Sequence, residues 1–295
     1  MKGLPLYLGY RMLAAMVGAL PEPAARRLGE SLGWAASFFA RSRLRLVERN
    51  LRRVTGTSDD VTKLARRAFA SYGRYWTEVF WVRARRKAAI VSHTDVVHLD
   101  RLHAARDEGN GVIVALPHIG NWEAAGARSE AEGTPVLAAA EALPNERLVD
   151  WFVAVRKAMG IEVAIAGKGR RVTAHLVKRL REGGTVALVA DRDLSGNGVE
   201  VEFFGERTTL PAGPAALADR TGAALLPVGC YFNKGKGHRF VINPAVEIPD
   251  LEDRSERVAA GTQRFATALE EIIREAPEQW HLFQPNWPSD RNGGV

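Results

Sequence analysis

Short apolar runs alternate with longer helical patterns over residues 95–275, and this alternation constrains the fold more than any other feature of the chain. We expect the apolar runs to be strands, and they cover 95–98, 112–116, 135–139, 161–165, 185–190, 223–230 and 239–243. We expect helices between and after them, near 99–108, 121–132, 145–159, 169–182, 212–221 and 254–275. Strands that alternate with helices are joined by crossover connections, which make the strands parallel. The sequence therefore predicts an α/β fold with a mainly parallel central sheet flanked by helices.

Residues 1–83 lack this alternation, and we interpret them as an N-terminal amphipathic helical region. Four helices are expected there, over 1–20, 22–40, 43–54 and 60–83. The third is rich in arginine on one side of an apolar stripe, which is a basic amphipathic pattern. The fourth carries aromatic residues at helical spacing, and these either form core or line a groove for an apolar ligand.

The first twenty residues are largely apolar but are interrupted by Lys2, Pro5 and Arg11, so we expect no membrane-spanning helix there. The Pro-Glu-Pro sequence that follows is a poor cleavage site for a signal peptide, so we expect the helix to be retained. Two interpretations of it stay open. It is either a packing helix at the edge of the domain or a helix that lies on a membrane surface.

The chain is basic, with a formal net charge of +7 and a pI near 9.8. Such a balance favours anionic partners, which include nucleic acid, acidic lipid headgroups and phosphate-bearing cofactors. The basic residues are scattered through arginine-rich amphipathic helices, which suit anionic lipid equally well. Charge alone does not separate these partners. We expect an anionic membrane surface as a partner, and no nucleic acid, because binding to nucleic acid would leave the polar strand-end residues described below without a role.

No internal repeat, low-complexity tract or linker interrupts the sequence. We expect a single domain over 1–287, with 1–83 as its helical, membrane-facing portion and 95–287 as its α/β portion, followed by a frayed tail over 288–295. The one cysteine, Cys230, lies in an apolar run and is expected to be an inert core thiol. A single cysteine also excludes an intramolecular disulfide and a cysteine-based zinc site.

Polar side chains stand within two residues of the carboxyl ends of three predicted strands, and they are His118, Glu141 and Asp191. Ligands of open parallel sheets bind outside these ends, so we expect the three side chains to face one edge of the sheet. Imidazole is suited to proton transfer near neutral pH. Asp191 could accept a hydrogen bond from one ring nitrogen of His118 and leave the other nitrogen free as a general base.

Several of these residues allow more than one interpretation. Glu123 follows His118 by about one helical turn, so it could orient the imidazole, act as a second acid or base, or simply favour a helix start through the helix dipole. Asp191 and Asp193 also match the short Asp-x-Asp pattern with which nucleotide-sugar glycosyltransferases bind a metal ion. We expect no metal site, because a three-residue pattern often occurs by chance. His118 itself could be a structural histidine.

Other histidines lie in ordinary polar contexts, and we expect them on the surface. They are His93, His98, His103, His175 and His238.

Several motifs together resemble those of the lipid A lauroyl/myristoyl acyltransferase-like family. They are Pro117-His118-Ile-Gly-Asn-Trp-Glu123, Asp191-Arg192-Asp193, Phe203-Phe-Gly-Glu with Thr209-Leu-Pro-Ala-Gly-Pro, and Gln279-Trp-His-Leu-Phe-Gln-Pro-Asn-Trp287. The resemblance extends from Tyr10 to Trp287, and the motifs are specific in combination. Within the family, the sequence is most similar to the actinobacterial branch that acylates phosphatidylinositol mannosides.

The resemblance implies a fold of the glycerolipid-acyltransferase type. It also implies that the protein is an acyl-CoA-dependent O-acyltransferase. The implied acceptor is a sugar hydroxyl of a membrane glycolipid, in first place a phosphatidylinositol mannoside, with a lipid A-type glucosamine lipid as the alternative. Acyl-CoA is then a co-substrate, and no cofactor is implied. The resemblance also implies a peripheral protein on the cytoplasmic face of the cell membrane.

The resemblance assigns catalytic roles to three residues. His118 would be the general base. Asp191 stands where the similar enzymes carry a glutamate that holds the histidine, and Glu123 matches the second residue of the general family motif. No serine or cysteine occupies a nucleophile elbow, so we expect direct transfer without an acyl-enzyme.

The substrates need further residues. Glu141 and Arg156 match positions at the acceptor site, and Arg156 and Arg192 could bind acceptor hydroxyls or phosphate. The acyl chain needs a long apolar groove, which helices 60–83 and 121–132 could line. Two rival functions remain: a metal-dependent glycosyltransferase that uses the Asp-x-Asp pattern, and a non-catalytic lipid binder that needs only the basic helices.

Overall fold

The computed structural model describes residues 4–57, 59–82, 86–141, 144–166, 171–193 and 196–292. Its centre is a seven-stranded sheet with the strand order β1-β9-β8-β2-β5-β3-β4. These strands are β1 (Thr94–Val97), β2 (Val112–Leu116), β3 (Val136–Glu141), β4 (Glu162–Ala166), β5 (Thr185–Val189), β8 (Ala224–Phe232) and β9 (His238–Ile242). Neighbouring strands pair in parallel except β8 and β9, which pair antiparallel. The prediction of a mainly parallel α/β sheet flanked by helices is confirmed.

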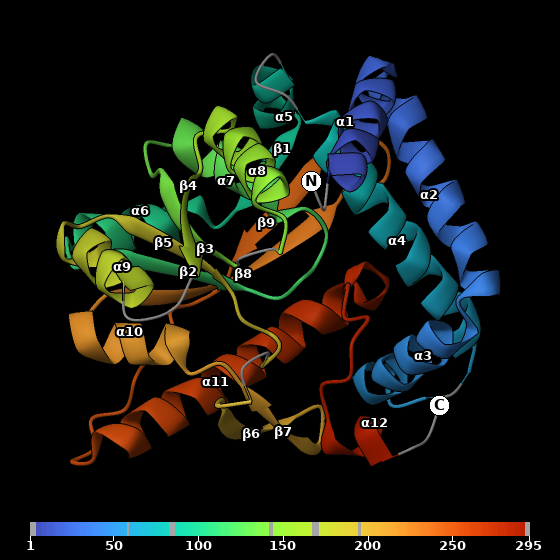
Figure 1. Cartoon of the computed structure of the whole chain (residues 1–295). Coiled ribbons are helices and arrows are strands. Elements are labelled where there is room, and N and C mark those ends of the chain that lie inside the picture. Colours follow the sequence, from blue (N-terminus) through green and yellow to red (C-terminus); the bar gives the residue numbers. More distant parts are fainter. Residues whose placement is uncertain are drawn as a thin grey trace.

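Helices cover both faces of this sheet (Figure 1). They are α5 (Lys87–Ser92), α6 (Leu99–Asp107), α7 (Trp122–Ala131), α8 (Glu146–Ala158), α9 (Arg171–Arg181), α10 (Gly213–Thr221) and α11 (Arg254–Glu275). α7 and α8 lie on one face, and α10 and α11 lie on the other. On the second face Ile113 and Val186 are fully buried, whereas Val114 and Ala187 on the first face line a cavity. The room for a ligand therefore lies between the sheet and α7 and α8.

The N-terminal helices stand beside this α/β part (Figure 1). They are α1 (Leu4–Ala19), α2 (Glu22–Phe39), α3 (Arg41–Thr55) and α4 (Val61–Trp81), close to the predicted bounds. α2 and α4 approach so closely that a Cβ at Gly29 or at Gly73 would overlap backbone atoms of the other helix. Within the described residues, none of the helices is long and apolar enough to cross a membrane.

The sequence analysis did not predict α5 or the two-stranded antiparallel hairpin outside the main sheet. The hairpin consists of β6 (Val199–Phe203) and β7 (Glu206–Leu210). Phe204 and Gly205 at the hairpin turn both have positive φ angles of 52° and 73°, as a two-residue type I′ turn requires.

The prediction of a frayed tail is wrong for its first five residues. Residues 288–292 form the short helix α12 (Pro288–Asn292). Asp290 is buried there, where it accepts hydrogen bonds from the amides of Asn286 and Trp287 and pairs with Arg53 of α3. The acidic residue thus ties the end of the described chain to the N-terminal helices.

Cys230 on β8 is fully buried, as predicted. Burial raises the pKa of its thiol far above the ordinary value, so the side chain stays protonated and inert.

Candidate active site

His118 and Asp191 meet at the carboxyl edge of the sheet because β2 and β5 are neighbours. The two strands pair in register up to Leu116 and Val189, and each chain then turns out of the sheet. His118 Nδ1 lies 2.5 Å from Asp191 Oδ1, and the His118 amide donates to Asp191 Oδ2 over 3.1 Å. The predicted pairing of these two strand-end residues is thus present.

Asp191 is fully buried and holds its charge through hydrogen bonds. Its Oδ2 also accepts from the indole nitrogen of Trp280 over 2.8 Å. Burial by itself would raise the pKa of Asp191, but the His118 imidazole and these hydrogen bonds outweigh it and lower the pKa to about 2. An ionised carboxylate only accepts hydrogen bonds, so Nδ1 of His118 carries the proton of the neutral ring and Nε2 is free to act as a base.

The backbone around His118 is fixed by the segment 279–281. The His281 amide donates to the His118 carbonyl over 2.7 Å, and the Gly120 amide donates to the Gln279 carbonyl over 3.1 Å. Gly120 has a φ of 55°, and a Cβ there would overlap the Cys230 carbonyl, so a glycine is required. His118 is therefore held through its side chain and through its main chain.

Glu123 contacts Arg156 rather than the imidazole. Its carboxylate accepts two hydrogen bonds from Arg156 Nε, at 3.0 and 3.1 Å, and one from Nη2 at 2.7 Å. Glu123 is buried, and its charge raises the pKa of Arg156 above the ordinary value, so the guanidinium stays charged. The structure thus brings together Glu123 and Arg156, which the sequence analysis had placed at different centres.

The remaining candidates occupy separate places. The backbone of Glu141 ends β3 at the same edge of the sheet, while its side chain lies outside the described part of the molecule. Arg192 is half-buried and donates from Nη1 to Gln284 Oε1 over 2.9 Å. Asp193 accepts from the amides of Gly196 and Gly198 and therefore belongs to a turn of the chain.

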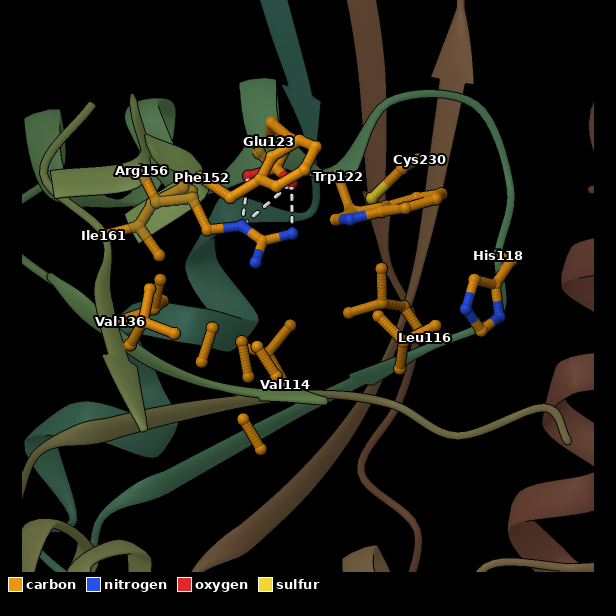
Figure 2. A pocket seen from close by; sticks show the side chains of 18 of the residues that line it. Val114, Leu116, His118, Trp122, Glu123, Val136, Phe152, Arg156, Ile161 and Cys230 are labelled. Carbon is orange, nitrogen blue, oxygen red and sulfur yellow. Dashed lines mark hydrogen bonds and ion pairs between the residues drawn. The ribbon is translucent and has the colours of Figure 1, made fainter. Parts of the chain in front are cut away.

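A cavity of about 510 Å³ extends between the sheet and α7 and α8. Figure 2 shows His118 at one end of it, Val136 and Ile161 toward the other, and the Glu123–Arg156 pair between them. The two helices that the sequence analysis proposed as lining both contribute to the cavity wall. α4 contributes Tyr72, Tyr75 and Trp76, and α7 contributes Trp122 and Gly126. α8 forms a further wall that the sequence analysis did not predict. A volume of this size holds a small apolar ligand.

His281 lines the same cavity and was missed by the sequence analysis. It is 6% exposed, and its Nε2 lies 2.9 Å from the Ser71 hydroxyl, while Nδ1 has no hydrogen-bond partner among the described residues. Burial, aided by the nearby His118, lowers the pKa of His281 to about 3, so the ring is neutral. Its only sequence signal was its place in the motif Gln279–Trp287.

The two carboxylates of the Asp-x-Asp pattern do not form one centre. Both carboxylate oxygens of Asp191 are hydrogen-bonded, one to His118 and the other to Trp280. Asp193 accepts instead from the amide of Gly198 and from the Thr209 hydroxyl. Across the described residues, no group of three or more His, Cys, Asp or Glu side chains is arranged to hold a metal ion.

His238 was expected on the surface, and this is wrong. It is 3% exposed and contacts the carboxylate of Glu78.

Comparison with known proteins relates this site to a family. Residues 5–289 match the family described as bacterial lipid A biosynthesis acyltransferase. The chain is 39% identical over 288 residues to the phosphatidylinositol mannoside acyltransferase of Mycolicibacterium smegmatis, covering 96% of this chain and 91% of that protein. It is 40% identical over 280 residues to the enzyme of the same name from Mycobacterium tuberculosis, covering 93% and 86%. The lipid A biosynthesis lauroyltransferase of Escherichia coli is 27% identical over 275 residues, covering 90% and 85%.

Proposed function

The chain belongs to the bacterial lipid A biosynthesis acyltransferase family and is an acyltransferase, and we propose that it moves a fatty acyl chain from acyl-CoA to a sugar hydroxyl of a phosphatidylinositol mannoside. The observation that carries this proposal is the His118–Asp191 pair at one end of a largely apolar cavity. The pair supplies a general base, and the cavity supplies room for an acyl chain.

The choice of acceptor follows the relatives. The proteins named phosphatidylinositol mannoside acyltransferase are 39% and 40% identical to this chain, and the lipid A lauroyltransferase is 27% identical. A glucosamine lipid of the lipid A type is therefore the second candidate acceptor.

The proposed reaction is a direct transfer. Nε2 of His118 takes the proton of the sugar hydroxyl while that oxygen attacks the thioester carbonyl carbon, and a new C–O bond forms. The C–S bond then breaks, and the CoA thiolate leaves with the proton that the imidazolium returns. Asp191 stabilises the imidazolium between the two steps because its carboxylate is ionised and hydrogen-bonded to the ring.

His281 is the proposed donor to the negative oxygen that develops on the thioester carbonyl. The hydroxyl of Ser71 can donate to Nε2, which leaves the proton of the neutral ring on Nδ1. That buried N–H has no partner among the described residues, so a substrate oxygen would satisfy it. A donor that is already in place lowers the barrier of such a step without reorganisation.

The charged residues of the cavity are assigned to the acceptor. Arg156 keeps donors beyond those bound to Glu123, and we assign it, with Arg192 and Glu141, to the sugar hydroxyls or the phosphate of the glycolipid. Glu123 fixes Arg156 in its place. This assignment replaces the expectation that Glu123 orients the imidazole.

Membrane attachment is also part of the proposal. α1 and α2 expose large apolar side chains, which are Leu6, Leu8, Met12, Leu13, Met16, Leu28, Leu32, Trp34, Phe38 and Phe39. With the net charge of +7, this surface suits the anionic cytoplasmic face of a cell membrane, on which the protein would lie as a peripheral protein.

The test is a transfer assay with radiolabelled palmitoyl-CoA and a panel of purified glycolipids. We expect labelled phosphatidylinositol mannoside from the wild type, none from His118→Ala, and normal product from His175→Ala, in which an exposed histidine of α9 is removed. Label only on a glucosamine lipid would show that the acceptor is of the lipid A type, while the proposed acyl transfer would stand. Absence of label from every acceptor, with sugar transfer that a chelator abolishes, would instead support the glycosyltransferase alternative.

A further inference from the structure

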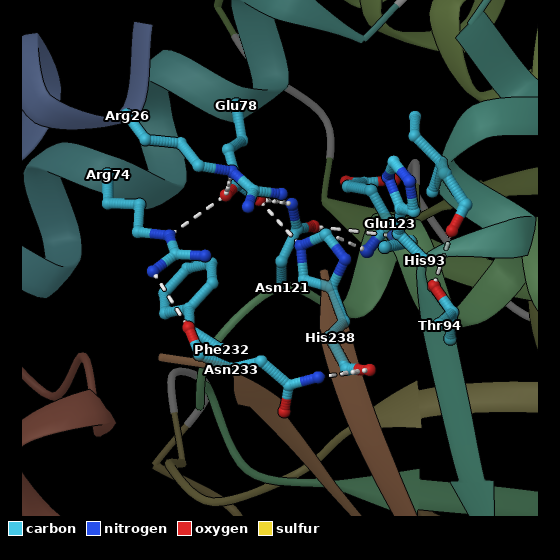
Figure 3. A network of polar contacts seen from close by, with 12 residues as sticks. Arg26, Arg74, Glu78, His93, Thr94, Asn121, Glu123, Phe232, Asn233 and His238 are labelled. Atoms are coloured by element: carbon cyan, nitrogen blue, oxygen red, sulfur yellow. Dashed lines mark hydrogen bonds and ion pairs between the residues drawn. The ribbon is translucent and has the colours of Figure 1, made fainter. Parts of the chain in front are cut away.

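A buried cluster of charged and polar side chains surrounds Glu78 of α4 (Figure 3). Glu78 Oε1 accepts from Arg74 Nε and pairs with Arg26 Nε, each over 2.9 Å. Its Oε2 lies 2.6 Å from Asn121 Nδ2 and 2.7 Å from His238 Nε2. The five side chains are all less than a tenth exposed, and they come from α2, α4, the start of α7 and β9.

The cluster is organised around one ionised carboxylate. Burial raises the pKa of Glu78, but His238, Arg74 and Arg26 outweigh it and lower the pKa far below the ordinary value. A carboxylate only accepts hydrogen bonds, so His238 presents its Nε2–H and Asn121 presents its amide N–H. Three hydrogen-bond donors and the ion-paired guanidinium of Arg26 thus converge on the two oxygens of Glu78.

Asn121 connects this cluster to the cavity. Its Oδ1 caps α7, because it accepts hydrogen bonds from the amides of Glu123 at 3.1 Å and Ala124 at 3.4 Å. Trp122, the first residue of α7, has its ring centroid 5.4 Å from that of His118. Glu123 holds Arg156. Both side chains of this first turn therefore line the cavity.

We propose that Glu78 is a positioning residue, which fixes the first turn of α7 through Asn121 and so places Trp122 and the Glu123–Arg156 pair in the cavity. This inference rests on the proposed acyl transfer. His118 has other anchors, because its imidazole contacts Asp191 and its carbonyl accepts from the amide of His281, so Glu78 governs how the substrates are seated and leaves these two contacts unchanged.

A reciprocal exchange tests the inference. Glu78→Gln removes the charge that pairs with Arg26 and leaves one acceptor oxygen for three donors, and Asn121→Asp sets a second carboxylate against Glu78. When both substitutions are combined, the amide oxygen of the new glutamine faces the arginines. The amide NH₂ of this glutamine donates to the new aspartate and to His238, whose neutral ring can accept in its other tautomer. Aspartate is as good a helix cap as asparagine. The double variant therefore restores the hydrogen bond with donor and acceptor reversed.

Two readouts are compared in the wild type, the two single variants and the double variant. The first is kcat/KM for palmitoyl transfer across pH, which we expect to fall about 10- to 100-fold in each single variant, with the pH dependence unchanged, and to recover in the double variant. The second is hydrogen–deuterium exchange of the peptide over 117–127, which should speed up in the single variants and recover in the double variant. The exchange readout needs no substrate.

The control is Glu30→Gln, which removes an acid that also contacts Arg74, at 3.4 Å, but does not contact Asn121. It should leave both readouts at the wild-type level. Single variants with wild-type rates and exchange would overturn the inference, and so would a double variant that recovers neither. A wild type without transfer to any acceptor would count against the proposed function, while the exchange data would still decide the role of Glu78.

Discussion

Two histidine–carboxylate pairs in this molecule have nearly the same contact and opposite surroundings. His118 lies 2.5 Å from Asp191, and His238 lies 2.7 Å from Glu78. The partners of Asp191 are a neutral indole and a backbone amide, and the imidazole of His118 remains 19% exposed. Glu78 instead faces two arginines, and His238 is buried with it. A histidine–acid pair is thus a candidate base only where the far ring nitrogen reaches a place that substrate can occupy.

The largest effect is expected from Asp191→Asn, and the absence of this effect would break the comparison. The amide would favour the wrong tautomer of His118 and could not stabilise the imidazolium, so we expect the rate of acyl transfer to fall by about 10³-fold or more while the fold persists. Steady-state transfer rates and circular dichroism spectra would be measured together. A rate close to wild type would return Asp191 to a purely structural role.

A smaller effect is expected at His281, and it separates the two ring nitrogens. His281→Asn places an amide donor where Nδ1 stands, whereas His281→Gln places one where Nε2 contacts Ser71. We expect the Gln variant to lose about 10²-fold in kcat and the Asn variant to keep most of the activity, because only Nδ1 is assigned to the oxyanion. Equal losses in both variants would argue against that assignment.

Acid should weaken the fold through Asp191. Its pKa in the folded protein is about 2, below the ordinary value of 3.8, so its contribution to stability is complete above the ordinary value and is lost as the pH falls through 2. The difference in unfolding free energy between wild type and Asp191→Asn should then shrink by about 2 kcal/mol between about pH 5 and about pH 2. Urea unfolding at several pH values measures this, and a constant difference would contradict it.

The smallest effect is expected from His238→Gln, which tests the second histidine–carboxylate pair, His238 with Glu78. The glutamine amide can donate to Glu78 where Nε2 of the imidazole does. We therefore expect a loss of about 1 kcal/mol in unfolding free energy and little else. Thermal unfolding would show whether the loss is larger, in which case the ring itself supports the cluster.

The sequence predicts the contact between His118 and Asp191 because each residue is found from the strand just before it. His118 and Asp191 each follow a recognisable buried strand, and parallel neighbours deliver their carboxyl ends to one edge. The Glu123–Arg156 pair and His281 were not predictable in this way. Their partners come from separate helices or from an irregular segment, and only the packing of the whole chain brings them together.

His238 carried a signal that was overlooked. His238 stands two residues before Phe240 and four before Ile242, and residues two apart on a strand share a face. The buried side of β9 therefore includes His238, although its polar neighbours in the sequence suggest the surface. Its partner Glu78 on a distant helix has no such signal.

The assignment of His118 as the general base is best tested by the rate of palmitoyl transfer from palmitoyl-CoA to phosphatidylinositol mannoside in His118→Ala and His238→Gln, measured in parallel with the wild type. We expect no detectable transfer in the first variant and nearly normal transfer in the second. Transfer at the wild-type rate by a folded His118→Ala variant would contradict the assignment.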